Sequence, residues 1–359
     1  MRTKLLIGTS KGLIIFKHRN NQWNCEAVQF EGLPVSMVYV DERTNTWWVA
    51  LSHRHWGEKL QRSLNEGASW QEVNIPNFGN HLYRPGKGAS LKKIWVMQHA
   101  GASQPGGLWM GTEPGGLFYS PDGKEFQLVE SLWNHPSRMD PNQWFGAGKD
   151  YPFIHSIVLD PQDSRHVYIG VSCAGVFETH DNGITWQAKN KGLVAAYLPN
   201  PNPEVGHDPH RMLICTTHPE VIWQQNHCGI FRTSNGGEQW NDVSGANGFP
   251  KYGFALAIEE NDPDTAWVIP AQSDEHRTPV GLHLTVCKTS DGGKTWVNFD
   301  KGLPHANAFD IVLRHSFVKS GGILVFGTNN GNLYTSEDSG STWRAVTQNL
   351  PMINYVTFA

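Results

Sequence analysis

Short apolar runs, most of them five or six residues long, recur along the whole chain and are separated by Gly, Pro, Asp and Asn. The stretch 154–179 is typical. Apolar residues 154–159 are followed by Asp160 and Pro161, and then by runs at 167–171 and 175–179. Runs of this length between turn residues indicate β-strands, and long stretches with helical periodicity are scarce. The pattern therefore predicts an all-β protein.

The runs fall into groups of four, which we call strands A to D of one repeat unit. Strand A precedes a turn with Pro or Asp, strands B and C are separated by a short break, and strand D is more polar. Strand A is predicted at 154–159 and 254–258, and the B and C pairs at 108–111 and 116–119, 167–171 and 175–179, and 323–327 and 332–335. Because a unit of this size cannot bury a core alone, the units must pack against one another.

One eight-residue phrase recurs between strands C and D and is clearest at residues 289–296, Thr-Ser-Asp-Gly-Gly-Lys-Thr-Trp. We expect the Asp291 carboxylate to accept hydrogen bonds from the backbone N–H groups one and two residues later. Gly293 supplies a position where φ can be positive, and Trp296 is expected to fold over the turn and bury it. Since these bonds use the polar groups of the phrase, we predict that the phrase has a structural role.

Five further copies of the phrase occur along the chain, one of them a residue short and closed by Phe. Their Asp or Asn and their closing aromatic residue are Asn65 and Trp70, Asp122 and Phe126, Asp181 and Trp186, Asn235 and Trp240, and Asp338 and Trp343. The closing residues follow one another about 47 to 60 residues apart, a period typical of propellers and solenoids.

The two ends of the chain complete the repeat. Residues 5–9, 12–17 and 23–28 read as strands B, C and D without a strand A, and residues 354–359 read as an isolated strand A. If the C-terminal strand pairs with residues 5–9, the chain closes into a ring of seven blades, and closure protects the sheet edges. We therefore predict an all-β, seven-bladed β-propeller of four-stranded antiparallel blades, in which residues 1–359 form one domain.

Composition narrows the range of partners. Charged residues make up 17% of the 359 residues, the net charge is −4 and no basic stripe is visible, so we expect no nucleic-acid partner. No apolar run is long enough to cross a membrane, and the first residues lack the features of a signal peptide. The five scattered cysteines suit reduced thiols better than a disulfide framework, which favours a cytoplasmic protein.

The longest connections are predicted on one rim of the ring. They are the D–A connections 74–89, 131–152 and 190–209 and the B–C connections 52–58 and 271–282. In a four-stranded blade, D–A and B–C connections share a rim, and the recurring turns lie on the opposite one. Because long loops on a rigid scaffold often carry function, we expect a binding site on the long-loop rim.

Two adjacent blades place histidines near this rim. His155 and His210 stand at the start of strand A in blades 4 and 5, and Cys173 and His227 stand in the B–C turns of the same blades. The aligned strand A positions of other blades hold Val35, Phe254 and Phe309. Imidazole and thiolate would suit Zn²⁺, but no tight local ligand spacing supports a metal. The alternative is that they are hydrogen-bonded residues of the channel and a buried thiol, and we expect no cofactor.

Other polar residues of the rim loops could meet a ligand. Together with His155, His210 and His227, the candidates are His53, His55, Trp56, Gln225, Asn226, Asp274 and Arg277. The indole faces of Trp56, Trp133 and Trp144 could stack on a sugar ring. The alternative for each of these residues is an ordinary solvated loop.

Glycoside hydrolysis would need two carboxylates that face each other across a cleft. The rim loops offer Asp140, Asp150, Glu204, Asp208, Asp274 and Glu275. The sequence does not pair them, so the catalytic residues stay unassigned. No Gly-rich phosphate loop opens a helix and no nucleophile elbow is present, which disfavours those chemistries.

The recurring phrase resembles the Asp-box, or bacterial neuraminidase repeat. Residues 5–12, 154–157 and 224–229 are similar to stretches of bacterial seven-bladed propellers described as sialidase-like or as relatives of the photosystem II assembly factor. The resemblance implies a structural role for Asp181, Trp186, Asn235, Trp240, Asp291, Trp296, Asp338 and Trp343. It leaves the function open because one fold hosts many activities. Sialidases have six blades, and their three-Arg clamp and Tyr–Glu pair have no matching positions in this chain.

The sequence therefore favours a cytoplasmic propeller that binds a small molecule, a glycan or a protein through its long-loop rim. Glycoside hydrolysis by rim carboxylates is one alternative. Metal-dependent chemistry at His155, His210, His227 and Cys173 is a second.

Overall fold

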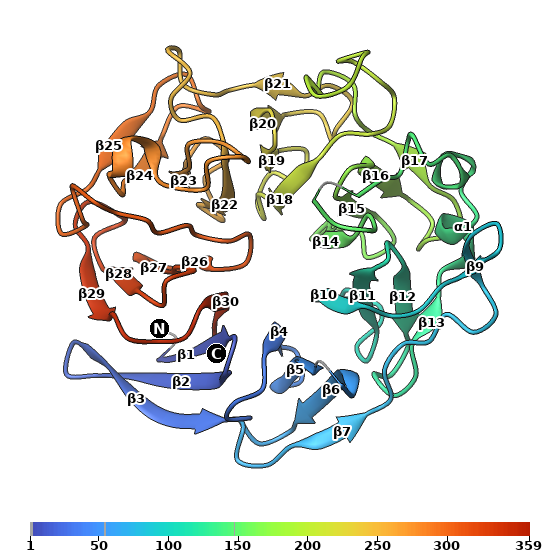
Figure 1. The fold of residues 1–359 in the computed structure, drawn as a ribbon, viewed down its shortest axis with the longest axis horizontal. Coiled ribbons are helices and arrows are strands. Elements are labelled where there is room, and N and C mark those ends of the chain that lie inside the picture. The colour runs from blue at the N-terminus through green and yellow to red at the C-terminus, as the bar shows by residue number, and fades with distance from the viewer. Residues whose placement is uncertain (1–2, 54, 147) are drawn as a thin grey trace.

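The computed structural model describes residues 3–53, 55–146 and 148–359. Within these residues, seven four-stranded antiparallel sheets surround a central channel (Figure 1). The first strand of each sheet lies at the channel and the fourth lies at the periphery. The predicted seven-bladed β-propeller is confirmed.

Within each blade, the strands follow one another from the channel outward. Blade 1 comprises β30 (Ile353–Phe358), β1 (Lys4–Thr9), β2 (Gly12–Arg19) and β3 (Gln22–Gln29), and blade 2 comprises β4 (Val35–Asp41), β5 (Thr46–His53), β6 (Gly57–Ser63) and β7 (Gln71–Val73). Blade 3 comprises β10 (Lys93–His99), β11 (Leu108–Glu113), β12 (Leu117–Ser120) and β13 (Gln127–Leu128), and blade 4 comprises β14 (Ile154–Leu159), β15 (Val167–Val171), β16 (Gly175–Thr179) and β17 (Gln187–Ala188). Blade 5 comprises β18 (Pro209–Ile214), β19 (Ile222–Asn226), β20 (Gly229–Thr233) and β21 (Asn241–Asp242), and blade 6 comprises β22 (Gly253–Ile258), β23 (Ala266–Pro270), β24 (Val286–Thr289) and β25 (Val297–Phe299). Blade 7 comprises β26 (Phe317–Ser320), β27 (Ile323–Gly327), β28 (Leu333–Ser336) and β29 (Arg344–Thr347).

Short elements lie in the connections. They are the two-stranded sheet of β8 (Leu82–Arg84) and β9 (Lys87–Gly88), the helix α1 (Glu130–Trp133), and the 3₁₀ turns Pro136–Met139 and Val280–Leu282. No helix among the described residues is long and apolar enough to cross a membrane.

The strand limits agree closely with the prediction except in blade 7. The prediction placed the start of strand A at Phe309, whereas β26 begins at Phe317 and Phe309 is 55% exposed. The prediction was wrong because Ile311 and Val312 are buried although the segment that contains them forms no strand. Buried apolar residues of such a segment resemble a strand in the sequence.

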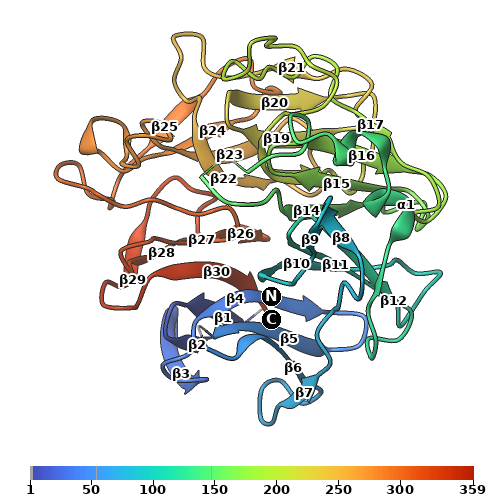
Figure 2. The same cartoon turned by 45° about the vertical axis from the view of Figure 1, so that its right-hand side comes forward.

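The C-terminal strand closes the ring. β30 pairs antiparallel with β1, with Leu5 opposite Phe358 and Ile7 opposite Val356. Figures 1 and 2 show β30 between β1 and the channel, beside the N-terminus. The predicted closure is confirmed, and it covers an edge of β1 that an open chain would expose.

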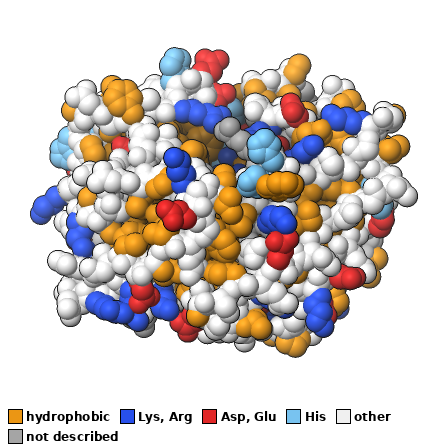
Figure 3. Space-filling view, turned by 60° about the horizontal axis from the view of Figure 1, so that its bottom comes forward, with side chains coloured by type: hydrophobic (Ala, Val, Ile, Leu, Met, Phe, Trp, Pro, Cys, Tyr) orange, Lys and Arg blue, Asp and Glu red, His pale blue; other side chains and the backbone are white. Residues whose placement is uncertain are grey.

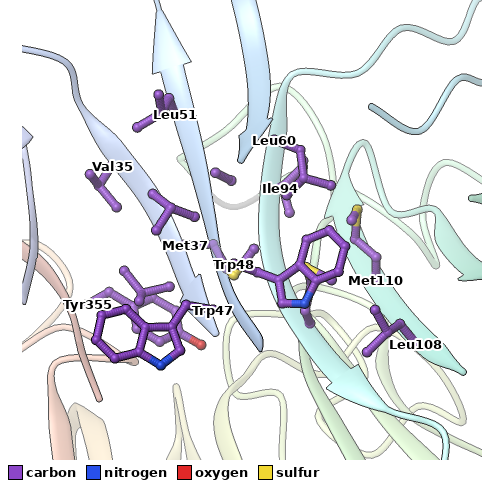
Figure 4. Packing of buried hydrophobic residues seen from close by; sticks show 14 of the residues in the cluster. Val35, Met37, Trp47, Trp48, Leu51, Leu60, Ile94, Leu108, Met110 and Tyr355 are labelled. Atoms are coloured by element: carbon purple, nitrogen blue, oxygen red, sulfur yellow. The ribbon is translucent and has the colours of Figure 1, made fainter. Parts of the chain in front are cut away.

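Successive blades pack face to face through large apolar side chains. Trp47 and Trp48 are neighbours in β5, and since side chains alternate along a strand they point to opposite faces of the sheet (Figure 4). Trp47 lies toward blade 1, near Ile15 and Gly67, whereas Trp48 lies toward blade 3, with its ring 6.4 Å from that of Phe126. Fully burying one such side chain stabilises the fold by about 1.5–3 kcal/mol, so these layers hold the ring rigid.

The recurring turn bonds differently from the prediction. Asp291 Oδ1 accepts from Thr289 Oγ1 (2.8 Å) and from the N–H of Thr295 (2.9 Å), and Oδ2 accepts from Thr295 Oγ1 (2.6 Å). The main N–H partner therefore lies four residues after Asp291, not one or two. The N–H groups of Asp291 and Gly293 donate to Thr289 Oγ1 instead. The Thr289 hydroxyl therefore takes the two N–H groups near the start of the turn. The Asp291 carboxylate joins the start of the turn, at Thr289, to its end, at Thr295.

The closing aromatic residues also connect neighbouring blades. Trp296 Nε1 donates to the carbonyl of Val243 in blade 5, and Trp240 Nε1 donates to that of Lys189 in blade 4, each at 2.8 Å. These two indoles therefore bond to the preceding blade, although we expected them only to bury their own turns. Trp343 Nε1 instead donates to the carbonyl of Gly340 in its own turn (3.0 Å).

Charge is dispersed over the surface. Lys and Arg side chains alternate with Asp and Glu over the face shown in Figure 3, with apolar side chains between them. All five cysteines are free.

Candidate functional site

Contacts between the long connections gather them at one end of the channel. The Arg84 guanidinium donates to the carbonyl of Arg138 and, at 2.7 Å, to that of Trp144, which joins segments 74–89 and 131–152.

Segment 190–209 lies at the same end. Gly206 N–H donates to the carbonyl of Ala174 in the B–C turn of blade 4 (2.8 Å). We call this end of the channel the loop mouth, and the opposite end, which carries the recurring turns, the turn end.

Asp208 lies at the centre of the polar groups of the loop mouth. It closes segment 190–209 immediately before β18 and is 3% exposed. Its Oδ1 accepts from Ser172 Oγ (2.7 Å) and from the N–H of Cys173 (3.3 Å). Although burial opposes ionisation, the facing histidines and Arg314 hold the pKa of Asp208 well below its usual range. The carboxylate is therefore charged at neutral pH.

His210 faces the other oxygen of this carboxylate. Its Nδ1 lies 2.6 Å from the carbonyl oxygen of Gly253, and its Nε2 lies 3.3 Å from Asp208 Oδ2. Since a carbonyl only accepts, Nδ1 carries the proton. Burial lowers the pKa of His210 and outweighs the opposite effect of Asp208, so the ring is neutral at neutral pH. Its Nε2 lone pair then faces the carboxylate.

His227, from the B–C turn of blade 5, lies between two carboxylates. Its Nδ1 is 3.5 Å from Asp208 Oδ2, and its Nε2 is 3.6 Å from Asp274 Oδ2 in the connection 271–282 of blade 6. Tyr197 and Tyr252 place their rings edge-on against the imidazole, with centroids 5.0 Å and 5.6 Å away. Three connections from two blades thus meet at His227.

A cation surrounded by aromatic rings lies beside this group. The Arg314 guanidinium carbon is 5.2 Å from the ring centroid of Phe254, 5.3 Å from that of Phe153 and 6.0 Å from that of Trp95. Arg314 Nε is buried without a hydrogen-bond partner among the described residues, and the described part of the chain offers no carboxylate within salt-bridge distance. Burial lowers the pKa of Arg314 even though Asp208 favours its charge.

Lys93 adds a second positive charge at the start of β10. Its Nζ lies 3.8 Å from the ring centroid of Trp95, which stacks on Phe153 at 4.2 Å. Burial, together with the charge of Lys149, lowers the pKa of Lys93 to about 8, so the amine is still mostly protonated at pH 7. The wall of the mouth around Arg314 is therefore aromatic and positively charged.

The structure separates the predicted candidates into two groups. His210, His227 and Asp274 lie together around Asp208, and Arg277 lies nearby, with its guanidinium carbon 5.4 Å from the Phe254 ring.

Two predicted metal candidates, His155 and Cys173, do not join the donor atoms around Asp208. His155 Nδ1 bonds to the hydroxyl of Ser156 (2.9 Å), and its Nε2 is buried and unpartnered among the described residues. The Cys173 thiol is buried, and burial raises its pKa, so it stays protonated. The side chain of His155 thus bonds to Ser156, whereas the Cys173 thiol lies beside Asp208 but is protonated, which makes it a poor metal ligand.

Gln225 and Asn226 hold the backbone in place. Gln225 Nε2 donates to the carbonyls of Gly229 and Lys251, and Asn226 Oδ1 accepts from the N–H of Cys228. Both are buried, so they support the turn that carries His227 and do not face the mouth.

The blade 2 candidates form a separate local turn. His53 Nδ1 accepts from the N–H groups of His55 and Trp56 (3.1 Å each), and Trp56 is 76% exposed. No contact joins these three residues to Asp208 in the described part of the chain. Arg54 lies outside the described residues.

Two of the three proposed tryptophan platforms belong to the core. Trp144 is fully buried, and Trp133 is buried against Phe78 with the Arg138 guanidinium 3.3 Å from its ring centroid. They cannot stack on a sugar, because their faces are already covered. Of the candidate carboxylates, only Asp208 and Asp274 meet the histidines, whereas Asp150, Glu204 and Glu275 are exposed and Asp140 caps a local turn.

The sequence missed Arg314, Trp95, Phe153 and Lys93. Arg314 was missed because strand A of blade 7 was placed at Phe309, which put Arg314 inside the strand instead of before it. Aligning blade 7 on its B and C strands would have placed Arg314 at the mouth. Trp95 and Phe153 carry no sequence signal, since aromatic residues of a propeller are usually core.

A cavity of about 310 Å³ lies in the other half of the channel. It is lined by the later residues of the inner strands, including Val40, Leu159 and Phe358, with Arg211 and His315 at its inner end. Aliphatic side chains and polar groups both line it, and Arg211 bonds to His315 there (2.8 Å). We place the candidate site at the loop mouth because charged groups from several long connections meet there.

Comparisons with known proteins agree with this fold. No family model matches the chain. The chain is 24% identical over 309 residues to "Xyloglucanase Xgh74A" of Acetivibrio thermocellus, covering 77% of this chain and 32% of that protein. It spans about a quarter to a third of the length of the curated relatives it matches.

Solved structures show the same architecture. An ancestral GH74 enzyme superposes with a TM-score of 0.57 at 16% identity, over 87% of this chain and 38% of that one. YCF48 bound to D1 peptide superposes with a TM-score of 0.56 at 12% identity, over 93% and 89% of the two chains. The protein is thus a seven-bladed propeller distantly similar to GH74 xyloglucanases, with a polar site at its loop mouth.

Proposed function

We propose that the protein binds a small, negatively charged organic ligand at the loop mouth. The observation that carries the proposal is Arg314, whose buried Nε has no partner among the described residues and whose guanidinium is surrounded by three aromatic rings. Removing a cation from water without pairing it costs free energy. A ligand carboxylate or phosphate would supply the missing acceptor, and the aromatic faces of Trp95 and Phe254 would pack against its apolar part.

Lys93 and Arg277 support the proposal with further positive charge. Lys93 lies over Trp95 and Arg277 lies over Phe254, two of the three rings that surround Arg314. Their combined field would attract an anion into the mouth. The net charge of −4 argues that this attraction is local and suits a small ligand better than a polyanion.

The test is a titration with glucuronate, inorganic phosphate and, as the uncharged comparison, glucose, followed by calorimetry. We expect at least one anion to bind, and its affinity to fall as salt rises. Arg314→Met keeps the apolar stem and removes the charge, so it should weaken binding at least about tenfold, since a charge-assisted hydrogen bond contributes roughly 1.5–3 kcal/mol. The matched control is Arg165→Met, because Arg165 is exposed and pairs only with Asp163 among the described residues.

Binding of glucose as tight as that of the anions would overturn the proposal. An affinity that Arg314→Met leaves unchanged would do the same.

Glycan hydrolysis is the second candidate. It is favoured by the similarity to xyloglucanases and by the carboxylates of Asp208 and Asp274 on either side of His227. Xyloglucan oligosaccharides are the substrates to test, with release of reducing ends as the readout. Asp274→Asn should reduce turnover at least about a hundredfold if Asp274 is the acid or base, whereas Glu204→Gln, an exposed carboxylate of the same rim, should not. Absence of turnover would leave binding as the function.

We also propose that the chain is an Asp-box propeller. The bonds of Thr289, Asp291 and Thr295, repeated at Thr179, Asp181 and Thr185, support this assignment. The five free thiols support the proposed cytoplasmic location.

A further inference from the structure

Three donor atoms of the loop mouth face one point. Asp208 Oδ2 lies 3.3 Å from His210 Nε2 and 3.5 Å from His227 Nδ1, and a donor atom of each residue lies within 4.8 Å of the other two. These separations exceed the length of a good hydrogen bond. Bonds of about 2.1 Å to a single tetrahedral ion separate its ligand atoms by about 3.4 Å. The two separations from Asp208 Oδ2 are therefore close to those of ligands around one ion.

Outer hydrogen bonds determine which atoms point inward. The Gly253 carbonyl takes the Nδ1 proton of His210, and Ser172 Oγ and Cys173 N–H occupy Oδ1 of Asp208. The Nε2 of His210 and Oδ2 of Asp208 are left facing each other at 3.3 Å, and a proton or a metal ion can lie between them. Backbone carbonyls and carboxylates that hold the far nitrogen of a histidine are typical of metal sites.

His227 lies between two carboxylates. Asp274 Oδ2 is 3.6 Å from its Nε2, beyond hydrogen-bond length, and Asp208 Oδ2 is 3.5 Å from its Nδ1. Asp274 therefore acts on the ring through its charge, on the side away from Asp208. Asp274 is exposed at the rim, so it acts as a positioning residue.

The other histidine–carboxylate groups of the described chain differ from this one. His166 uses both nitrogens at hydrogen-bond length, 2.9 Å to Asp160 and 2.9 Å to Glu178, and Lys189 also pairs with Glu178. The donor atoms of this group are therefore already hydrogen-bonded to one another.

A second such group lies at the surface. His283 Nε2 is 2.9 Å from Asp300, and His305 stacks on His283 at 4.9 Å. Its imidazole and carboxylate already lie at hydrogen-bond length near the surface, which makes this group a useful control.

We propose that Asp208 Oδ2, His210 Nε2 and His227 Nδ1 bind one divalent transition-metal ion, with Zn²⁺ the best match to two imidazoles and a carboxylate. Three protein ligands leave at least one coordination position open, as in catalytic and ligand-binding zinc sites. That position would face the mouth, beside Arg314. The metal proposal does not require the organic anion proposed above, although an anion could occupy the open position.

The experiment uses the full chain without a histidine tag, because a tag binds the same metals. The protein is treated with chelator, exchanged into metal-free buffer and titrated with ZnCl₂ by calorimetry, and a parallel sample is loaded with Co²⁺ for its visible spectrum. We expect one equivalent of Zn²⁺ to bind, a Co²⁺ spectrum typical of four or five ligands, and a rise in melting temperature on binding.

Variants assign the ligands. His227→Ala should weaken Zn²⁺ binding at least about a hundredfold and Asp274→Asn about tenfold, because loss of an outer partner costs 10- to 100-fold in affinity. Replacing both His283 and His305 with Ala should leave the affinity unchanged. If His210→Ala fails to fold, His227→Ala carries the test, since the side chain of His227 is partly exposed.

Failure of the two proposals can be told apart. Arg314→Met should retain Zn²⁺ and lose the anion, whereas His227→Ala should lose Zn²⁺. Absence of stoichiometric binding of Zn²⁺, Co²⁺ or Mn²⁺ by the folded protein would overturn the metal proposal. So would a Zn²⁺ affinity that falls with the surface pair His283 and His305 and not with His227.

Discussion

The two ends of the propeller use aspartate in opposite ways. At the turn end, Asp291 directs both carboxylate oxygens to a hydroxyl and an N–H of its own turn. At the loop mouth, Asp208 has one oxygen held by Ser172 and the other directed at two histidines 3.3 Å and 3.5 Å away. Both oxygens of Asp291 are used in hydrogen bonds that stabilise its own turn. Asp208 is held in place through one oxygen, and its other oxygen can still bind a ligand.

A similar contrast separates two particular residues, Trp240 and Arg314. The indole of Trp240 donates to a carbonyl of the neighbouring blade, so its polar atom is satisfied. The guanidinium of Arg314 is equally surrounded by apolar rings but leaves Nε unpartnered among the described residues. Unpartnered buried nitrogens also occur on scaffold residues in the described part of the chain, among them Trp186 Nε1 and the terminal nitrogens of Arg138, so the missing partner of Arg314 points to function only together with its place at the loop mouth.

Deleting residues 355–359 should have the largest effect, because it removes the ring closure on which both ends depend. The deletion takes Val356 and Phe358 from the core and exposes the inner edge of β1. We expect the unfolding free energy to fall by more than about 4 kcal/mol, since two buried side chains at roughly 2–5 kcal/mol each are lost. Thermal unfolding followed by circular dichroism is the measurement. Deleting Ala359 alone is the control, and an unchanged melting temperature for the longer deletion would contradict closure.

Trp240→Ala should destabilise the turn end without affecting the mouth. Trp240 is buried and bonds to Lys189, so we expect a loss of about 3–5 kcal/mol in urea unfolding. Trp56→Ala, at an exposed indole, should change stability by no more than about 0.5 kcal/mol. Zn²⁺ binding per folded molecule should be the same in both variants, and a change in the Trp240 variant would mean that the two ends are coupled.

Replacing Asp291 or Asp208 with Asn should separate the effect of each carboxylate on folding stability from its effect on Zn²⁺ binding. Asp291→Asn should cost less than about 1 kcal/mol, because Asn235 already holds the equivalent place and its Oδ1 accepts from Thr233 Oγ1 and the N–H of Gln239. Asp208→Asn keeps an oxygen for Ser172 but removes the buried charge that Arg314 faces, so it should cost more stability than Asp291→Asn and should abolish Zn²⁺ binding per folded molecule. Equal Zn²⁺ affinity in the two variants would refute the contrast between the two ends.

The smallest expected effect is an acid transition. Hydrogen bonds from Thr185 and Thr295 lower the pKa values of Asp181 and Asp291 to about 2, below the ordinary value of 3.8. A carboxylate with a depressed folded-state pKa contributes stability that is fully present above its unfolded pKa and is lost as pH falls through the folded value. Stability should therefore decline between about pH 4 and pH 2. Melting curves of Asp291→Asn should show a shallower decline in this range than the parent, and parallel curves would contradict the assignment.

Much of the fold could be predicted from the sequence because its signals are local. The recurring turn closes within seven residues, from Thr289 to Thr295, and each copy bonds to itself wherever the chain runs. The seven-blade count followed from the strand A at the C-terminus. The error in blade 7 arose where apolar residues such as Ile311 are buried outside any strand.

The candidate site could be predicted only in part. His210 and His227 were found because they occupy repeat-aligned positions, and Asp208 was named only as one of several loop carboxylates. His155 shares the aligned position of His210, yet its Nδ1 bonds to Ser156, whereas that of His210 bonds to Gly253. Identical positions in the repeat thus lead to different partners, and the partner decides whether a nitrogen faces the mouth.

By itself, the sequence determined the architecture of this protein, since alternating apolar positions and self-contained turns act over fewer than ten residues. The tertiary structure alone decided the site. Asp208, Asp274 and Arg314 come from three different connections of the ring, and only its curvature and closure bring their side chains to the same end of the channel. Which of their polar atoms remain free depends on hydrogen bonds made across blades, and no local pattern encodes those bonds.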